Sequence, residues 1–405
     1  MSAATTYEIF AITAPGLEAV CAAELAAAGI ATDPHVDDGG VSWTGGARSL
    51  YRANLECRTA SRVVVRAGTF RARTFAELER HAARIDWPRF VSGGRAITLR
   101  VTCRKSKLYH EGAVAERLEN VLGAAVGARV ERTTADDDAD DGAGAGTTSP
   151  LVVPQLVPQL MVVRFMRDVC TISIDSSGTL LHQRGYRQAL AKAPVRETIA
   201  AAMLLAAGWD GSAPLIDPMC GAGTIPIEAA LIARRIAPGL ANADRTPRRY
   251  SFEQWPHFDA SAWGDVVAAA RALVLPSSQV PIAGSDRDAG AITAATANAE
   301  RAGVAEDVQL RRATVTELDP PAHAGHVITN PPYGVRVGDA RALLPLYAAL
   351  GRVARERLDG WSVSLLVASP RLAGAMGLAF EELLSTRNGG IPVQLVRAHI
   401  RLAAG

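Results

Sequence analysis

Apolar and polar positions alternate in short, regular blocks along the first part of the chain. A period of two predicts a strand, and apolar residues recurring every three or four positions predict a helix. By this criterion strands cover residues 7–13, 39–46, 61–70 and 95–104, and helices cover residues 15–29, 47–55, 74–84 and 111–126. Repeated β-α-β units with short connections predict small α+β units rather than one large parallel sheet.

An acidic, glycine-rich segment at residues 133–160 interrupts this pattern. Its first part, TTADDDADDGAGAGTTSP, offers few apolar side chains to bury. Such a composition cannot offset the entropy lost on ordering, so we interpret the segment as a disordered surface insertion. Two strands follow within residues 161–178, joined by a turn near Arg167 and Asp168.

From residue 195 onward, apolar strands alternate with longer helices. Helices are predicted at residues 195–207, 224–237, 288–302 and 341–357, and strands at residues 214–219, 280–286, 307–313, 325–330 and 361–368. Five apolar strands with intervening helices predict a doubly wound α/β sheet. A final antiparallel pair is predicted at residues 379–387 and 392–402. A chain of 405 residues is long enough for two or three domains.

The charge is unevenly distributed. The formal net charge is only +2, but residues 58–107 contain thirteen arginines and lysines against three acids. This stretch is either a nucleic-acid footprint or a solvated, arginine-rich surface, and its composition fits both equally well.

Cysteine usage and hydropathy restrict the cellular setting. The five cysteines are widely spaced and include no Cys-x-x-Cys motif, so neither a disulfide framework nor a zinc site is predicted. The N-terminus does not read as a signal peptide, and no apolar run is long enough for a membrane span. We therefore expect a cytoplasmic protein with reduced thiols, without a metal and without a membrane partner, whose oligomeric state the sequence does not indicate.

The sequence DPMCGAGT, residues 217–224, follows a predicted strand and begins a helix. Gly221 and Gly223 allow a tight turn and close approach to a ligand, at the strand end where open α/β sheets bind ligands. The third glycine of a pyrophosphate fingerprint is absent, and the next strand to end in an acid places Asp286 more than sixty residues on. Asp286 suits the two hydroxyls of a ribose, and Asp217 would face a positive charge. S-adenosylmethionine fits these features. Alternatively, Asp286 caps the following helix, a role that Asp288 could fill instead.

The sequence NPPYG, from Asn330, ends the fourth strand at the same edge of the sheet. Pro331 and Pro332 lack amide protons, so nearby carbonyls are free to accept other hydrogen bonds. An Asn oxygen and a prolyl carbonyl could grip an exocyclic amino group and free its delocalised lone pair, while Tyr333 stacks on a flat base. The alternative is a proline turn with a structural Asn.

Together the motifs DPMCGAGT, GSDRD and NPPYG resemble those of amino-methyltransferases that use S-adenosylmethionine. Residues 172–209, the N-terminal segment ITAPGLEAVCAAEL and the C-terminal segments GWSVSLLVASPRL and TRNGGIPV resemble THUMP-domain RNA guanine-N2 methyltransferases, above all those acting on bacterial 23S rRNA. The resemblance implies a ferredoxin-like segment at residues 1–60, a THUMP RNA-binding domain at 61–178 and a Rossmann-like seven-stranded methyltransferase domain at 179–405. It also implies a sheet whose last two strands form a hairpin.

The resemblance further assigns residues to the site. The cofactor would contact Asp217, Pro218, Cys220, Gly221, Gly223, Thr224, Asp286, Arg287 and Thr314. The last of these stands where the family usually places an acid or amide near the adenine. Methyl transfer would depend on Asn330, Pro331, Pro332 and Tyr333.

Basic residues near two predicted loops favour RNA as the partner. Arg104, Lys105 and Lys107 precede a helix start beside Tyr109, and Arg184 and Arg187 lie near the methyltransferase domain. Phosphates are bound by cations and by helix N-termini, and a guanine would have to be flipped out for its N2 to be reached. The expected activity is guanine-N2 methylation of 23S rRNA. The alternatives are methylation of tRNA and a catalytically silent RNA-binding or assembly factor.

Overall fold

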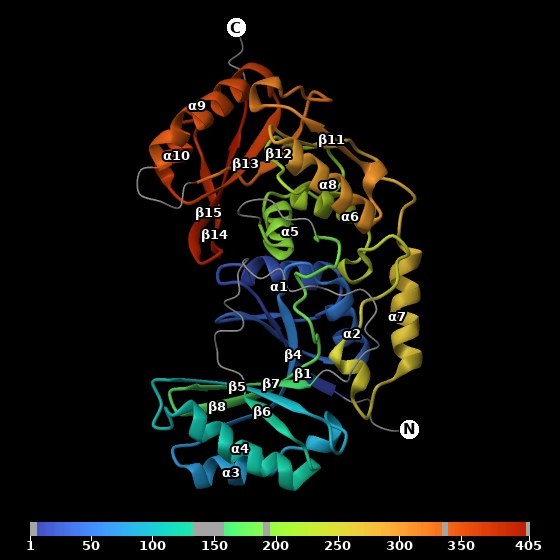
Figure 1. Cartoon of the computed structure of the whole chain (residues 1–405), viewed down its shortest axis with the longest axis vertical. Helices are drawn as coiled ribbons and strands as arrows, with labels where there is room; N and C mark the ends of the chain where they lie inside the picture. Colours follow the sequence, from blue (N-terminus) through green and yellow to red (C-terminus); the bar gives the residue numbers. More distant parts are fainter. Residues whose placement is uncertain (1–5, 133–157, 189–194, 334–338, 402–405) are drawn as a thin grey trace.

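The protein, described here from a computed structural model, contains two sheets that lie one above the other along its long axis (Figure 1). The structure describes residues 6–132, 158–188, 195–333 and 339–401. The predicted disordered insertion therefore lies outside the described residues as far as residue 157. Its last two residues are part of a strand, because β7 begins at Gln159.

The N-terminal sheet has eight strands in the order β2-β3-β1-β4-β8-β7-β5-β6. Their bounds are β1 Thr6–Ile12, β2 His35–Asp37, β3 Gly40–Gly46, β4 Arg62–Arg71, β5 Ile97–Arg104, β6 Val130–Arg132, β7 Gln159–Met166 and β8 Val169–Asp175. β4 pairs antiparallel with β1 on one side and with β8 on the other. The sheet thus continues across residue 60, where the sequence predicted small separate units. The domain boundaries remain predictions.

Four helices cover this sheet, namely α1 Glu18–Ala27, α2 Ala47–Glu56, α3 Phe75–Ala82 and α4 Glu111–Val126. The helices α2, α3 and α4 each begin within two residues of the predicted start, whereas α1 begins at Glu18 instead of residue 15. Local sequence explains one start directly, because the Thr74 hydroxyl accepts from the Glu77 amide and the Glu77 carboxylate accepts from the Thr74 amide. Such a capping box satisfies two amide protons at the end of a helix.

The C-terminal sheet has seven strands in the order β11-β10-β9-β12-β13-β15-β14. The strands are β9 Leu215–Asp217, β10 Ile282–Asp286, β11 Val308–Arg312, β12 Gly325–Thr329, β13 Trp361–Val367, β14 Glu381–Asn388 and β15 Ile391–His399. The first five run parallel, and β15 pairs antiparallel with both β13 and β14. The predicted Rossmann-like fold with a closing hairpin is therefore confirmed.

The helices of this half are α5 Glu197–Ala206, α6 Thr224–Ala233, α7 Ala260–Ala272, α8 Ala289–Ala302, α9 Asp339–Arg357 and α10 Pro370–Gly374. No helix in the described part of the chain is long and apolar enough to cross a membrane.

The segment between α6 and β10 was not predicted, and it packs against the N-terminal half. Figure 1 shows α7 beside α2 and below the C-terminal sheet, although β9 and β10 of that sheet flank α7 in sequence. Tyr51 of α2 stacks on Phe252 with ring centroids 4.5 Å apart and meets the edge of Trp263 at 5.9 Å. Its hydroxyl accepts from the Asp259 amide at 3.1 Å. Aromatic contacts thus tie the two halves together.

Replacing Tyr51 tests this aromatic contact. We expect Tyr51→Ala to lower the free energy of unfolding by about 3 kcal/mol, because a buried ring is lost and a cavity remains. Tyr51→Phe keeps the ring and should cost only about 1 kcal/mol, the usual contribution of one hydrogen bond. Urea unfolding followed by tryptophan fluorescence measures both. Equal losses in the two variants would contradict the role of the ring.

Candidate active site

The parallel strands bring three polar side chains to one edge of the C-terminal sheet. In β9, Leu215 is paired with Ile282 of β10 and with His326 of β12. Asp217 ends β9, Asp286 ends β10, and Asn330 follows the last residue of β12. Because parallel strands end at the same edge, these residues face one region, as the sequence predicted.

The glycine loop between β9 and α6 has the predicted sharp turn. Gly221 and Gly223 have φ values of +52° and +84°, which glycine adopts without strain. A Cβ at Gly223 would lie 3.0 Å from the Ala295 Cβ, so the loop also packs closely on α8. Asn298 of α8 donates to the Ala222 carbonyl at 2.9 Å and holds the loop from behind. Asn298 was not predicted as a site residue, since nothing in its local sequence sets it apart.

Asp286 connects the second strand to this loop. Its carboxylate accepts from the Gly221 amide at 3.1 Å and from the Asp288 amide at 2.9 Å. The cap of α8 is Asp288, whose side chain accepts from the Gly290 amide at 2.8 Å. Asp288 thus fills the capping role that the sequence left open between the two acids, and Asp286 remains half-buried at the sheet edge.

Asp217 is the last residue of β9. It is buried and accepts from the Met219 amide at 3.1 Å. Burial raises the pKa of Asp217 to about 7, against the opposing effect of the hydrogen bond from the Met219 amide. Pro218, Cys220 and Thr224 beside it are also buried, so they shape the loop from within.

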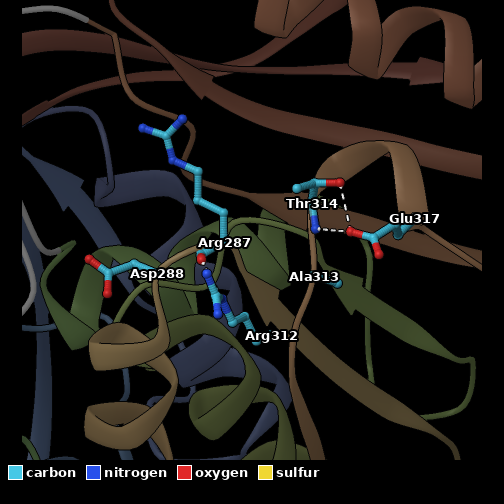
Figure 2. Close-up of a pocket in the computed structure, with 6 residues that line it drawn as sticks. All are labelled: Arg287, Asp288, Arg312, Ala313, Thr314 and Glu317. Atoms are coloured by element: carbon cyan, nitrogen blue, oxygen red, sulfur yellow. Dashed lines mark hydrogen bonds between the residues drawn. The ribbon is translucent and has the colours of Figure 1, made fainter.

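A cavity of about 600 Å³ opens beside Asp286 at the ends of β10 and β11 (Figure 2). It is lined by Arg287, Asp288, Arg312, Ala313, Thr314 and Glu317. Thr314 lines this cavity, and its amide and hydroxyl both donate to Glu317, each at 2.8 Å. Thr314 therefore caps a short helical turn. Glu317 was missed, although the Thr-x-x-Glu spacing of a capping box could have indicated it.

The Asn330 side chain has a buried acceptor. Its Oδ1 atom is inaccessible to solvent and has no hydrogen-bond partner among the described residues. Pro331 is buried and Pro332 is exposed. The Pro332 carbonyl accepts from the Tyr347 hydroxyl of α9 at 3.2 Å. A buried oxygen without a partner is costly, so its retention at a strand end is typical of a functional site.

Tyr333 is placed differently from the prediction. It is only 7% exposed, and its hydroxyl accepts from the Asn388 Nδ2 atom at 2.7 Å. Burial raises the pKa of the Tyr333 hydroxyl, so it is neutral. In this structure the ring is packed rather than open as a platform for a base. Neither its burial nor its partner on β14 could be read from the local sequence.

The predicted basic residues fall into two groups. Arg104 at the end of β5 and Lys105 and Lys107 in the loop that leads to α4 are exposed, and Tyr109 is 72% exposed beside them. The Asp168 carboxylate accepts from the Lys107 amide at 2.8 Å, which anchors the loop while the lysine side chains stay exposed.

Arg184 and Arg187 contradict the prediction of RNA contact. Arg184 is buried, donates to the carbonyls of Leu181 and Arg58 at 2.7 and 2.6 Å, and pairs with Glu228 of α6. Arg187 pairs with the buried Glu197 at 3.3 Å. Both guanidinium groups are used within the fold, so they are not free to bind phosphates.

Much of the basic stretch at residues 58–107 is also used internally. Arg62 pairs with Asp175 at 2.8 Å, Arg66 pairs with Glu8 at 3.0 Å, and Arg73 pairs with Asp168 at 3.0 Å. The exposed basic surface is therefore narrower than the sequence count suggested.

The five cysteines are free thiols. Within the described part of the chain, Cys21, Glu24 and Cys57 form the single group whose ligand atoms could surround a metal. The Glu24 carboxylate already accepts from the amides of Arg58 and Thr59 and from the Thr59 hydroxyl. Its oxygens are thus satisfied by the protein, and the predicted absence of a metal stays a prediction.

Comparisons with known proteins agree with this geometry. Residues 184–397 match the family described as RMKL-like, methyltransferase domain, and residues 8–64 match the RlmL ferredoxin-like domain. A protein of Synechocystis sp., provisionally named an RNA methyltransferase, is 33% identical over 394 residues, which cover 97% of each chain. The ribosomal RNA large subunit methyltransferase K/L of Shewanella sp. is also 33% identical, over 94% of this chain and 51% of its own length. The chain thus spans about half of that relative.

A solved structure shares the whole architecture. SMU.472, a provisionally named methyltransferase complexed with SAH, superposes with a TM-score of 0.83 at 28% identity, covering 98% of this chain and 99% of its own. The chain therefore belongs to the RMKL-like methyltransferase family and has an N-terminal ferredoxin-like domain of the RlmL type.

Proposed function

We propose that this protein transfers a methyl group from S-adenosylmethionine to the exocyclic N2 amino group of a guanosine in 23S rRNA. The observation that carries the proposal is the Asn330 Oδ1 atom, a buried acceptor without a partner among the described residues, at the sheet edge beside the glycine loop. An amino group is a donor of matching chemistry.

The residues present fit S-adenosylmethionine. The glycine loop gives close backbone approach, the half-buried Asp286 carboxylate suits the ribose hydroxyls, and the adjacent cavity of about 600 Å³ has room for the adenine. SMU.472 was solved with SAH, the product form of this cofactor, which supports the assignment. When bound, the cofactor supplies an already activated methyl group.

The protein's part is then positioning. Asn330 Oδ1 would accept from one N–H bond of the amino group, and the Pro331 carbonyl would accept from the other. Held this way, the nitrogen lone pair would be withdrawn from the purine ring and left free to react. The surplus proton on the alkylated amino nitrogen would pass to solvent water. Fixed acceptors need no reorganisation during the reaction, which is the main source of rate enhancement in such sites.

RNA is favoured as the substrate by the basic loop and by the relatives. Arg104, Lys105 and Lys107 are exposed between the end of β5 and the start of α4, and the relatives' names refer to RNA and to the large ribosomal subunit. The N-P-P-Y motif itself does not choose among amino groups, so rRNA and guanine N2 rest on the family likeness. Methylation of tRNA is the alternative within the same chemistry.

A methylation assay with an Asn330 variant tests the proposed reaction. Purified protein with S-adenosylmethionine and unmodified 23S rRNA should yield N2-methylguanosine, measured by mass spectrometry of digested nucleosides. Asn330→Ala should lower kcat by about 100-fold, because one fixed acceptor is lost, while cofactor affinity measured by calorimetry stays unchanged. Full activity in this variant would refute the mechanism. Product in tRNA alone, or on adenine, would refute the substrate assignment.

Asp217 predicts a pH dependence of cofactor binding. Because its pKa is raised to about 7, the carboxyl is largely protonated at pH 6 and ionised at pH 8. A cationic ligand favours the ionised form, so affinity for S-adenosylmethionine should increase between pH 6 and 8, by at most about tenfold per unit. SAH, which lacks the sulfonium charge, should respond less. Asp217→Asn should flatten the profile in calorimetry, and an unchanged slope would contradict the assignment.

The basic loop predicts a salt-dependent contribution to RNA binding. Lys105→Ala with Lys107→Ala should weaken binding and reduce the slope of log affinity against log salt by about one per lysine. Arg129→Ala is the matched control, since this exposed residue precedes β6 near the start of β5, away from the Arg104 end. Filter binding at several salt concentrations measures both. If the salt slope fell by the same amount per removed charge in the lysine variant and in Arg129→Ala, RNA binding would reflect nonspecific charge rather than a docking loop.

A further inference from the structure

The turn of the closing hairpin fixes one side chain near the N-P-P-Y motif. Asn388 ends β14 and is paired with Ile391 of β15 across Gly389 and Gly390. These glycines have φ values of +55° and +76°, as a two-residue type I′ turn requires. The turn sets the register of the hairpin, so the position of Asn388 is determined by the turn geometry.

Asn388 donates to the Tyr333 hydroxyl at 2.7 Å, and the two residues are 5% and 7% exposed. From the other side, the Tyr347 hydroxyl of α9 donates to the Pro332 carbonyl at 3.2 Å. The motif is therefore held between α9 and the hairpin. Hydrogen bonds shielded from water constrain position more strongly than exposed ones.

The same hairpin touches the N-terminal half. Gly16, in the loop between β1 and α1, has a φ of +87°, and a Cβ there would lie 1.7 Å from the Ser385 carbonyl oxygen of β14. The two backbones are thus in direct contact three residues before Asn388. One strand connects the half that carries the basic loop to the residue that holds Tyr333.

We propose that Asn388 is a positioning residue for methyl transfer. Through the Tyr333 hydroxyl it holds the segment from Asn330 to Tyr333 in place. The backbone contact between Gly16 and β14 fixes the position of the hairpin that carries Asn388. This inference rests on the proposed function, since it concerns the same acceptor site.

A double-mutant cycle in the full chain tests the role of Asn388. Asn388→Ala and Tyr333→Phe should each lower kcat about fivefold, as expected for one lost hydrogen bond, with KM for RNA and cofactor affinity within twofold of wild type. The double variant should be no slower than the slower single variant, because both remove the same contact. Asn388→Asp, whose carboxylate can accept from the Tyr333 hydroxyl and so restore a hydrogen bond in the reverse direction, should recover part of kcat. The proposal would be overturned if the double variant lost kcat by the product of the two single losses. It would also be overturned if the variants lowered Tm but left kcat unchanged.

Asn330→Ala in the same assay separates the two claims. If that variant stays active, the proposed function fails. If it is inactive while Asn388 and Tyr333 are uncoupled, only the positioning role fails.

The contact between Gly16 and β14 is tested by comparing alanine substitutions at Gly16 and at a control glycine, Gly39. Gly16→Ala introduces both backbone strain and the clash with Ser385. Gly39→Ala, at a φ of +85° with open space around its Cβ position, introduces the strain alone. We expect Gly16→Ala to lower kcat at least threefold more than Gly39→Ala. Equal kcat values for the two variants would show that the contact with β14 does not position the site.

Discussion

The site depends on one constraint, the parallel pairing of β9 between β10 and β12. Leu215 aligns with Ile282 and with His326, so the next residues of all three strands leave the sheet at the same edge. The glycine loop, the Asp286 carboxylate and the Asn330 amide follow from that alignment. A shift of one strand by a single residue would move all of its side chains to the opposite face of the sheet, and the three groups would no longer meet.

Buried charges connect this edge to the N-terminal half. Arg184 donates to the Arg58 carbonyl on one side and pairs with Glu228 of α6 on the other. Arg58 in turn donates to the Ile236 carbonyl at 2.7 Å. Removing one member of a buried pair leaves an uncompensated charge, which is far more destabilising than the loss of a surface pair. The helix that follows the glycine loop is thus held against the N-terminal half.

Sequence patterns predicted the structural features that are determined by residues close together in the chain. The alternation of strands and helices, the closing hairpin and the glycine loop are local features, and the structure confirms them. Patterns could not distinguish Arg184, which is buried, from Lys105, which is exposed, because the difference arises from contacts with distant residues. The packing of α7 on α2 and the hydrogen bond between Asn388 and Tyr333 are missing from the prediction for the same reason.

An acceptor that must receive a substrate has to lack a partner within the protein. Among the residues that the structure describes, Asn330 Oδ1 has no partner. A buried acceptor in that state costs about 1–3 kcal/mol, and a mobile side chain would recover this energy by turning to another donor. The surrounding structure has to prevent that movement. Prolines with fixed φ follow Asn330, Tyr347 holds the carbonyl of the second proline, and Asn388 holds Tyr333. The rigidity of the motif is therefore the condition under which an Asn330 oxygen without a partner in the described part of the chain can persist.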